Sequence, residues 1–275
     1  MALKMIKGGT WMKIGFIGLG NMAKAMIGGM LSKEIVRKED IIGSAKTEHT
    51  LDQVNQMYGI MTTSDNQLVA KEADILFLAI KPQFFGEVLP EIRGVLRKEA
   101  LIVSIAAGKT IADIEGLLSA DIKLVRCMPN TPALVGEGCT GACRNGHVSD
   151  EEMEVCMKLL RSFGVAEEVP ERLINAVAGV SGCSPAYVFQ FLEALADGAV
   201  LAGMPRKQAY TFAAQAVLGS AKLMLETGKH PGELKDMVTS PAGTTIEGVR
   251  VLEEKGFRGA VIDAVKASVE KSENM

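Results

Sequence analysis

The fold of this chain is decided by one stretch near its start, Lys13-Ile14-Gly15-Phe16-Ile17-Gly18-Leu19-Gly20-Asn21-Met22-Ala23. In it, a short apolar run passes directly into Gly-x-Gly-x-x-Ala, and an alanine-rich helical pattern follows at once. Glycine at 18 allows a sharp turn, and the bare backbone at Gly20 lets a phosphate approach the amides whose dipoles converge there. The stretch therefore predicts a strand, a tight turn and a helix N-terminus that hold a pyrophosphate, although an ordinary strand-to-helix turn is the alternative.

The composition is that of a folded globular protein of one large or two modest domains, and we expect two. The chain has 275 residues, of which 48% are hydrophobic and 23% are charged. Its formal net charge of -3 and the absence of Lys/Arg blocks predict no nucleic-acid partner. The longest apolar runs, such as 75–80, are too short to span a bilayer, so no membrane association is expected.

The N-terminus and the cysteines indicate a cytoplasmic protein. Residues 1–11 lack the apolar core of a signal peptide, and we treat them as a dispensable extension because Met12 could itself be an alternative start. Five cysteines, an odd number without a secretion signal, suit a reducing compartment better than a disulfide framework.

Apolar strands and helical segments alternate through the first part of the chain, which predicts a parallel sheet. Strands are expected at 40–44, 60–62, 73–80, 101–105 and 123–127, and a strand, a helix and a last strand between 139 and 169. Ligands of such a sheet lie beyond the carboxyl ends of the strands. Four strand ends should therefore meet at one crevice, namely 18–22, 79–82, 106–108 and 128–132.

The end of the second strand bears on the choice of cofactor. A carboxylate at this position would receive the ribose 2′-hydroxyl of NAD, whereas a 2′-phosphate needs hydroxyls, amides or cations. The strand ends in Ser44-Ala45-Lys46-Thr47 without an acid, and Glu48 follows. NADP is therefore favoured.

From Glu171 onward the sequence predicts helices and no strand, at 185–201, 205–226, 232–238, 245–255 and 257–271. We therefore expect an α/β chain with a Rossmann-like dinucleotide-binding domain at 12–169 and an all-helical domain at 170–275. Val188, Leu192, Leu195 and Ala199 form a stripe at helical spacing. This stripe fits either a core within one chain or a dimer interface.

Two side-chain clusters are weaker candidates for chemistry. Cys139, Cys143 and His147 are spaced by four residues, but no fourth ligand or CxxC pair accompanies them, so we expect no metal. Glu193 and Asp197 lie four residues apart on one helical face, where solvated carboxylates are commoner than a catalytic pair. No Gly-x-Ser-x-Gly nucleophile elbow is present, which disfavours hydrolysis.

The segment 239–247, Thr-Ser-Pro-Ala-Gly-Thr-Thr-Ile-Glu, is the informative part of the helical domain. Ser240 before Pro241 reads as an N-cap, and Thr244-x-x-Glu247 reads as a capping box. Either start gathers hydroxyls and free amides at the positive end of a helix, which suits a small carboxylate. Plain helix capping is the alternative.

Taken together, these motifs resemble pyrroline-5-carboxylate reductases over essentially residues 13–272. The resemblance is carried by 16–22, 79–82, 126–132, 179–187, 194–198 and 230–245, the last beginning His230-Pro231-Gly232-Glu233 and being the most specific. Cys183 departs from the serine that is usual in this family, and Met237 from a frequent asparagine. These departures put polar contacts from the two positions in doubt, but not the reaction.

The resemblance implies hydride transfer from NADPH, with NADH also usable, to 1-pyrroline-5-carboxylate, giving L-proline. It also implies intertwined homodimers that can assemble further. The implied cofactor-binding residues are Gly18, Leu19, Gly20, Asn21, Met22, Ser44, Asn66, Ala79, Ile80, Lys81, Pro82, Ala106, Ala107 and Gly108. The implied substrate-binding residues are Ser240, Gly243, Thr244 and Thr245. Our mechanistic hypothesis makes Thr245 the catalytic residue, because its hydroxyl would hydrogen-bond the ring nitrogen.

Two other functions are open to a chain of this plan. A 3-hydroxyacid dehydrogenase shares the two-domain organisation but carries a catalytic lysine early in its second domain, and this chain has no lysine between Val169 and Gly203. A non-catalytic NADP-binding sensor would bind the dinucleotide without turnover.

Overall fold

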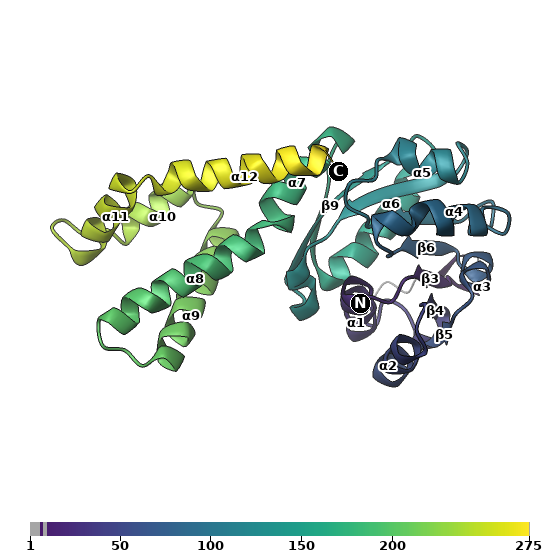
Figure 1. Cartoon of the computed structure of the whole chain (residues 1–275), viewed down its shortest axis with the longest axis horizontal. Coiled ribbons are helices and arrows are strands. Elements are labelled where there is room, and N and C mark those ends of the chain that lie inside the picture. The colour runs from purple at the N-terminus through teal and green to yellow at the C-terminus, as the bar shows by residue number, and fades with distance from the viewer. Residues whose placement is uncertain (1–5, 8–9, 275) are drawn as a thin grey trace. The chain divides into compact units, whose positions relative to one another are not determined.

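The computed structural model describes residues 6–7 and 10–274, with side chains from residue 12 onward. Its contacts divide the chain into two compact units (Figure 1). One comprises the residues up to Gly182 and those from Val269, and the other comprises Cys183–Ser268. The predicted extension 1–11 lies largely outside the described residues, and its described parts, β1 (Ile6–Lys7) and β2 (Thr10–Trp11), pair antiparallel.

The first unit is built on an eight-stranded sheet in the order β10-β9-β8-β7-β6-β3-β4-β5. Its strands are β3 (Ile14–Ile17), β4 (Ile41–Ser44), β5 (Met61–Thr63), β6 (Ile75–Leu78), β7 (Leu101–Ser104), β8 (Lys123–Met128), β9 (Gly138–Arg144) and β10 (Gly164–Glu168). The six strands β8-β7-β6-β3-β4-β5 follow the doubly wound order, and its switch point lies between β3 and β6. The prediction of an all-parallel sheet is wrong at one place, because β9 runs antiparallel to β8.

Alternate residues of the central strands pack into two separate cores, one on each face of the sheet. Phe16 and its register partner Phe77 stack in one core, with ring centroids 4.8 Å apart, while Ile17 and Leu78 lie in the other. The first core contains residues of α1 (Asn21–Ser32), α2 (Glu48–Tyr58) and α6 (Asp150–Leu160). The second contains residues of α3 (Asn66–Glu72), α4 (Phe85–Arg93), α5 (Ile111–Leu117) and α7 (Ile174–Val177).

Several of these helices have a side-chain cap at their N-terminus. At α3, Asp65 accepts from two backbone amides, and at α6, Ser149 and Glu152 form a capping box. Helix α5 was not predicted, although Thr110 and Asp113 form a capping box at its start. Short helical turns complete the unit at Lys38–Asp40, Pro82–Phe84, Thr131–Val135, Arg161–Phe163 and Glu171–Leu173, with a π-helix at Ala178–Gly182.

The second unit contains helices only among its described residues, as predicted. They are α8 (Ser184–Leu201), α9 (Arg206–Thr227), α10 (Pro231–Met237), α11 (Thr244–Glu254) and the greater part of α12 (Phe257–Glu273). Helices α8 and α9 pack side by side (Figure 1). The Tyr187 hydroxyl hydrogen-bonds the Ser268 hydroxyl, which joins α8 to α12.

Large apolar side chains of this unit lie exposed in the single chain. Leu201 and Leu225 are 90% and 81% exposed, and Val188 and Leu195 of the predicted stripe are 38% and 40% exposed. The stripe is therefore not the core of one chain, and apolar surface of this extent is typical of subunit interfaces. Within the described residues, no helix is both long and apolar enough to cross a bilayer.

Candidate functional site

A groove of about 430 Å³ lies in the first unit where the carboxyl ends of β3 and β6 adjoin. Ligands of doubly wound sheets bind at this switch point. The groove brings together nine of the fourteen predicted cofactor-binding residues. It is lined by Gly18, Leu19, Gly20, Asn21, Lys24, Ser44, Ala45, Lys46, Thr47, Thr50, Asn66, Ala79, Ile80, Lys81, Phe84 and Val88.

The glycines of the opening stretch have two different roles in this groove. Gly18 has a φ of +95°, and a Cβ built on it would lie 2.6 Å from the carbonyl oxygen of Ala79 on the neighbouring strand. A side chain there would strain the turn and collide with backbone. Gly20 is the N-cap of α1 without a side-chain cap, and nothing lies within 4 Å of a Cβ built on it. The groove is therefore open where a pyrophosphate would meet the free amides of α1.

Hydrogen bonds hold the end of β4 against the turn at Gly18. The Gly18 amide donates to the Ser44 carbonyl at 2.9 Å, and the fully buried Ser44 hydroxyl donates to Asn66 Oδ1 at 2.7 Å. Asn66 Nδ2 in turn donates to Glu91 Oε2 at 3.2 Å. These bonds set the floor of the groove at the place where a ribose would lie.

The groove has a positive lining, with three lysines and no carboxylate. Lys24 donates to Gln53 Oε1 at 2.6 Å. The Lys46 ammonium lies 4.8 Å from the centroid of the Phe84 ring and 3.4 Å from Glu87 Oε1. Lys46 is exposed and Lys24 is half-buried, and their long side chains can reorient toward a phosphate.

The remaining predicted cofactor-binding residues lie outside this groove. Met22 is in the first turn of α1 and packs against the first core, and Pro82 begins the turn Pro82–Phe84. Ala106, Ala107 and Gly108 follow β7, where the Ala106 amide donates to Ser104 Oγ at 3.4 Å.

Seven groove residues were not among those predicted to bind the cofactor, namely Lys24, Ala45, Lys46, Thr47, Thr50, Phe84 and Val88. Lys24 could have been found because it lies three residues after Asn21 and hence on the same face of α1. Thr47 and Thr50 could have been found as the N-cap and first turn of the helix that follows the acid-free strand end. Phe84 and Val88 carried no such signal.

The predicted substrate-binding residues form a turn before α11 in the second unit. The Gly243 amide donates to the Ser240 carbonyl at 3.0 Å, and Ala242 has a φ of +57°. Helix α11 begins at Thr244, one residue before the predicted start, but both predicted caps are wrong because Gly243 is the N-cap. Glu247 does not reach back to the cap and instead pairs with Arg250 at 2.6 Å.

This turn exposes donors that the described chain does not use. The hydroxyls of Ser240, Thr244 and Thr245 are exposed and have no hydrogen-bond partner in residues 12–274. No side chain caps Gly243, so the first amides of α11 are free as well. A Cβ at Gly243 would lie 2.3 Å from Ser240 Oγ, so a glycine is needed for this tight turn.

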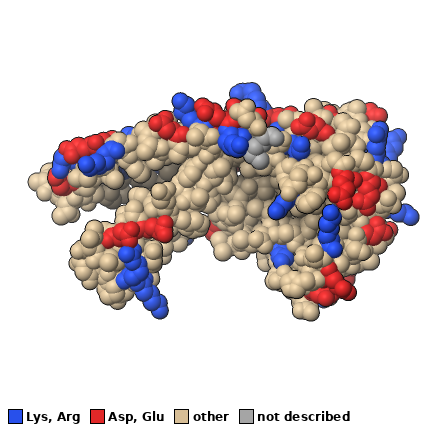
Figure 2. Space-filling view, viewed as in Figure 1, with Lys and Arg blue, Asp and Glu red and all other residues tan. Residues whose placement is uncertain are grey.

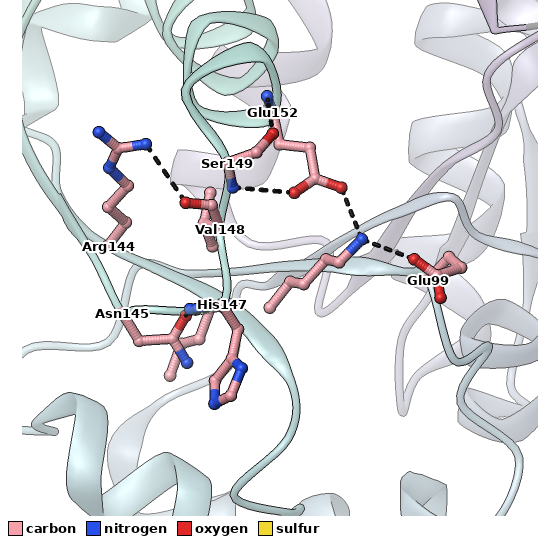
Figure 3. Close-up of polar contacts among 9 residues, drawn as sticks. Glu99, Arg144, Asn145, His147, Val148, Ser149 and Glu152 are labelled. Atoms are coloured by element: carbon pink, nitrogen blue, oxygen red, sulfur yellow. Dashed lines mark hydrogen bonds and ion pairs between the residues drawn. The ribbon is translucent and has the colours of Figure 1, made fainter.

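No residue of the two weaker candidate clusters lines the groove. Figure 3 shows His147 in the turn between β9 and α6, where its amide donates to Asn145 Oδ1 at 3.2 Å. No group of metal-ligating side chains occurs within the part of the chain that the structure describes. Burial raises the pKa of Cys143 to about 11, which leaves a protonated, inert thiol. Asp197 pairs with Arg206 at 2.5 Å.

A larger cavity of about 540 Å³ lies at the opposite ends of the strands, beside Met12, Asp74 and Leu101. Lys123 lies nearby and donates to Glu99 Oε2 at 2.6 Å and to Glu152 Oε1 at 2.7 Å (Figure 3). This is the amino edge of the parallel strands, away from the edge where ligands of such sheets bind. The smaller groove, at the carboxyl edge, is therefore the candidate cofactor site.

Comparisons with known proteins agree with this geometry. A family model described as pyrroline-5-carboxylate reductase dimerisation matches residues 171–275, and one described as NADP oxidoreductase, coenzyme F420-dependent, matches residues 13–108. The pyrroline-5-carboxylate reductase of Escherichia coli K12 is 52% identical over 263 residues, which cover 96% of this chain and 98% of that protein.

Two solved structures share the whole fold. A pyrroline-5-carboxylate reductase from Coxiella burnetii superposes with a TM-score of 0.91 at 34% identity, covering 96% of this chain and 98% of the other. The Plasmodium falciparum pyrroline carboxylate reductase, solved with NADP bound, has a TM-score of 0.85 at 33% identity over 96% and 97% of the two chains.

These findings confirm the predicted fold class, the oxidoreductase class and NAD(P)H as the cofactor, and they give the chain a dimerisation domain. Of the 263 residues aligned with the Escherichia coli reductase, 52% are identical, and they cover nearly the whole chain. The chain belongs to the pyrroline-5-carboxylate reductase family.

Proposed function

We propose that this chain reduces the C=N bond of 1-pyrroline-5-carboxylate to give L-proline, with NADPH as the preferred donor and NADH as a second one. The observation that carries the proposal is the groove at the switch point, which has three lysines, no carboxylate and open space at Gly20. The substrate is the one for which the related reductases are named. NADPH, when bound, supplies the hydride.

The proposed cofactor site extends the groove along the strand ends. Gly18 to Met22 would hold the pyrophosphate at the N-terminus of α1, and Ser44 and Asn66 the adenosine ribose. Ala79 to Pro82 would border the middle of the dinucleotide. The small residues Ala106, Ala107 and Gly108 leave room for a flat nicotinamide ring.

The proposed substrate site is the turn before α11. The substrate carboxylate would accept hydrogen bonds from the free amides around Gly243 to Thr245, at the positive end of that helix. Ser240 and Thr244 add hydroxyl donors, and the Thr245 hydroxyl would hydrogen-bond the ring nitrogen. A protonated imine is already strongly electrophilic, so orientation and charge placement suffice without a dedicated acid.

The proposed organisation is a dinucleotide-binding domain at 12–169 and a helical dimerisation and substrate domain at 170–275. Homodimers would cover the exposed apolar faces of the helical domain and could assemble further. The five free cysteines support a cytoplasmic location. On the face shown in Figure 2, acidic and basic side chains are interspersed, which supports our expectation of no nucleic-acid partner.

Replacing Lys46 with glutamine is expected to raise the KM for NADPH about tenfold and to leave that for NADH unchanged, because a cation beside the end of β4 favours the 2′-phosphate. Steady-state kinetics with both cofactors measure the effect. Lys71→Gln, outside the groove, is the matched control. Equal changes with the two cofactors would rule out a 2′-phosphate contact by Lys46.

The function itself is tested by the loss of NADPH absorbance when 1-pyrroline-5-carboxylate is added to the purified protein. We expect rapid oxidation of NADPH with this imine. We expect no reduction of NADP⁺ when 3-hydroxyacids are supplied instead. NADP-dependent oxidation of a 3-hydroxyacid would favour the dehydrogenase alternative. Tight NADPH binding without turnover on any of these substrates would favour the sensor.

A further inference from the structure

A buried arginine lies in the centre of β8. Arg126 is 4% exposed, and its Nη1 donates to Glu171 Oε1 at 2.9 Å. Its Nε has no hydrogen-bond partner within the described part of the chain. A buried guanidinium is costly to desolvate, and an apolar residue of similar size often stabilises a fold equally well. The stability of the fold therefore does not explain this pair.

The same carboxylate oxygen also holds the start of α5. Glu171 Oε1 accepts from the Ile111 amide at 2.8 Å, and Ile111 is the first residue of that helix. Glu171 itself begins the turn Glu171–Leu173 and is the first residue matched by the dimerisation family model. One oxygen atom thus joins β8, α5 and the entry to the helical region.

These contacts meet at the loop of residues 105–110, between β7 and α5. At its start, Ser104 pairs with Arg126 in the sheet register, and the Ser104 hydroxyl accepts from the Ala106 amide at 3.4 Å. At its end, the Ile111 amide is bound to Glu171. Between these two anchors, Gly108 has a φ of +70°, a conformation that glycine adopts without strain. Arg126 and Glu171 therefore fix both ends of the loop that contains Ala106, Ala107 and Gly108.

We propose that Arg126 and Glu171 are positioning residues, which hold the 105–110 loop where it orients the nicotinamide ring for hydride transfer. The inference rests on the proposed function, in which this loop borders the nicotinamide. In this proposal Glu171, the first residue of the dimerisation region, helps to shape the cofactor site. Small displacements of reacting groups cost large factors in rate, so the contribution should be visible in the hydride-transfer step.

The test compares Glu171→Ala with Glu168→Ala. Glu168 pairs with Arg144 at 3.1 Å and has a side-chain exposure of 44% against 37% for Glu171, but it has no bond to the loop. Three quantities are measured: the single-turnover rate of hydride transfer at saturating NADPH, the Kd of NADPH, and the Kd of 2′,5′-ADP, which lacks the nicotinamide.

For Glu171→Ala, we expect hydride transfer about tenfold slower and NADPH binding about threefold weaker, with 2′,5′-ADP binding within twofold of the unsubstituted protein. Glu168→Ala should leave all three quantities within twofold. Glu171→Gln keeps an oxygen that accepts from Ile111, so it should restore most of the rate. A general structural defect would instead weaken both nucleotides together and would not be rescued by glutamine.

An unchanged rate in Glu171→Ala, or equal losses in Glu171→Ala and Glu168→Ala, would overturn the inference. If Glu171→Ala does not fold, Glu171→Asp, whose shorter side chain withdraws the oxygen from the Ile111 amide, must show slower hydride transfer with unchanged 2′,5′-ADP binding. A normal rate in that variant would overturn the inference too. If the unsubstituted protein does not reduce the imine, the proposed function fails. The selective effect on NADPH over 2′,5′-ADP then still decides the positioning role.

Discussion

Replacing Thr245 with alanine is expected to lower kcat about 100-fold and to leave the Kd of NADPH within twofold. Thr245 lies in the first turn of α11 with an exposed hydroxyl that no other residue in 12–274 engages. In the proposed mechanism this hydroxyl hydrogen-bonds the ring nitrogen while charge shifts on it, and removing one such preorganised donor typically costs 10²- to 10³-fold. Steady-state turnover and NADPH titration measure the two quantities.

The controls for this substitution come from the same segment. Thr245→Ser keeps the hydroxyl and should retain most of the activity. Thr239→Ala removes a hydroxyl that already donates to the carbonyls of Lys235 and Asp236, at 3.1 Å each, and should leave turnover unchanged. Because alanine favours helix, Thr245→Ala should not unfold α11. Full turnover in Thr245→Ala would exclude the role that we assign to it.

Replacing Gly20 with alanine is expected to weaken NADPH binding about 100-fold while the protein remains folded. In the free protein nothing lies within 4 Å of the new methyl group, and the φ of −73° at this residue suits alanine. The methyl group would instead occupy the space through which a pyrophosphate approaches the first amides of α1. Isothermal titration with NADPH and a thermal melt measure the two effects.

Two other glycines separate lost binding from lost stability. Gly86→Ala in α4 also meets open space and should bind NADPH normally. Gly18→Ala must push against the Ala79 backbone at 2.6 Å with a φ of +95°, so it should lower the melting temperature as well as binding. Normal NADPH binding by Gly20→Ala would place the pyrophosphate elsewhere.

The sheet and its switch point were predictable because local signals agree there. The Gly18-x-Gly20 turn, the buried strands on either side of it and the helix that begins at Asn21 all indicate the same unit. The direction of β9 was not predictable, because its alternation of side chains is the same in parallel and antiparallel pairing. Most other strands and helices of the first unit followed from hydrophobic periodicity, but α5 did not.

The start of α11 shows where such signals compete. Ser240-Pro241 and Thr244-x-x-Glu247 each satisfy a capping rule, yet the structure uses neither. The turn that closes between Ser240 and Gly243 places Gly243 at the cap, and Glu247 pairs with Arg250 instead. The contacts of Glu171 were not predictable either, because its partners Arg126 and Ile111 are 45 and 60 residues away in sequence.

Isotope transfer from NADPH tests the central claim most directly. The protein is incubated with 1-pyrroline-5-carboxylate and NADPH that carries deuterium at the transferred position of its nicotinamide, and the product is analysed by mass spectrometry and NMR. Our account predicts L-proline with one deuterium at C5 and one NADP⁺ formed for each proline. Unoxidised cofactor, or a product without deuterium at C5, would contradict it.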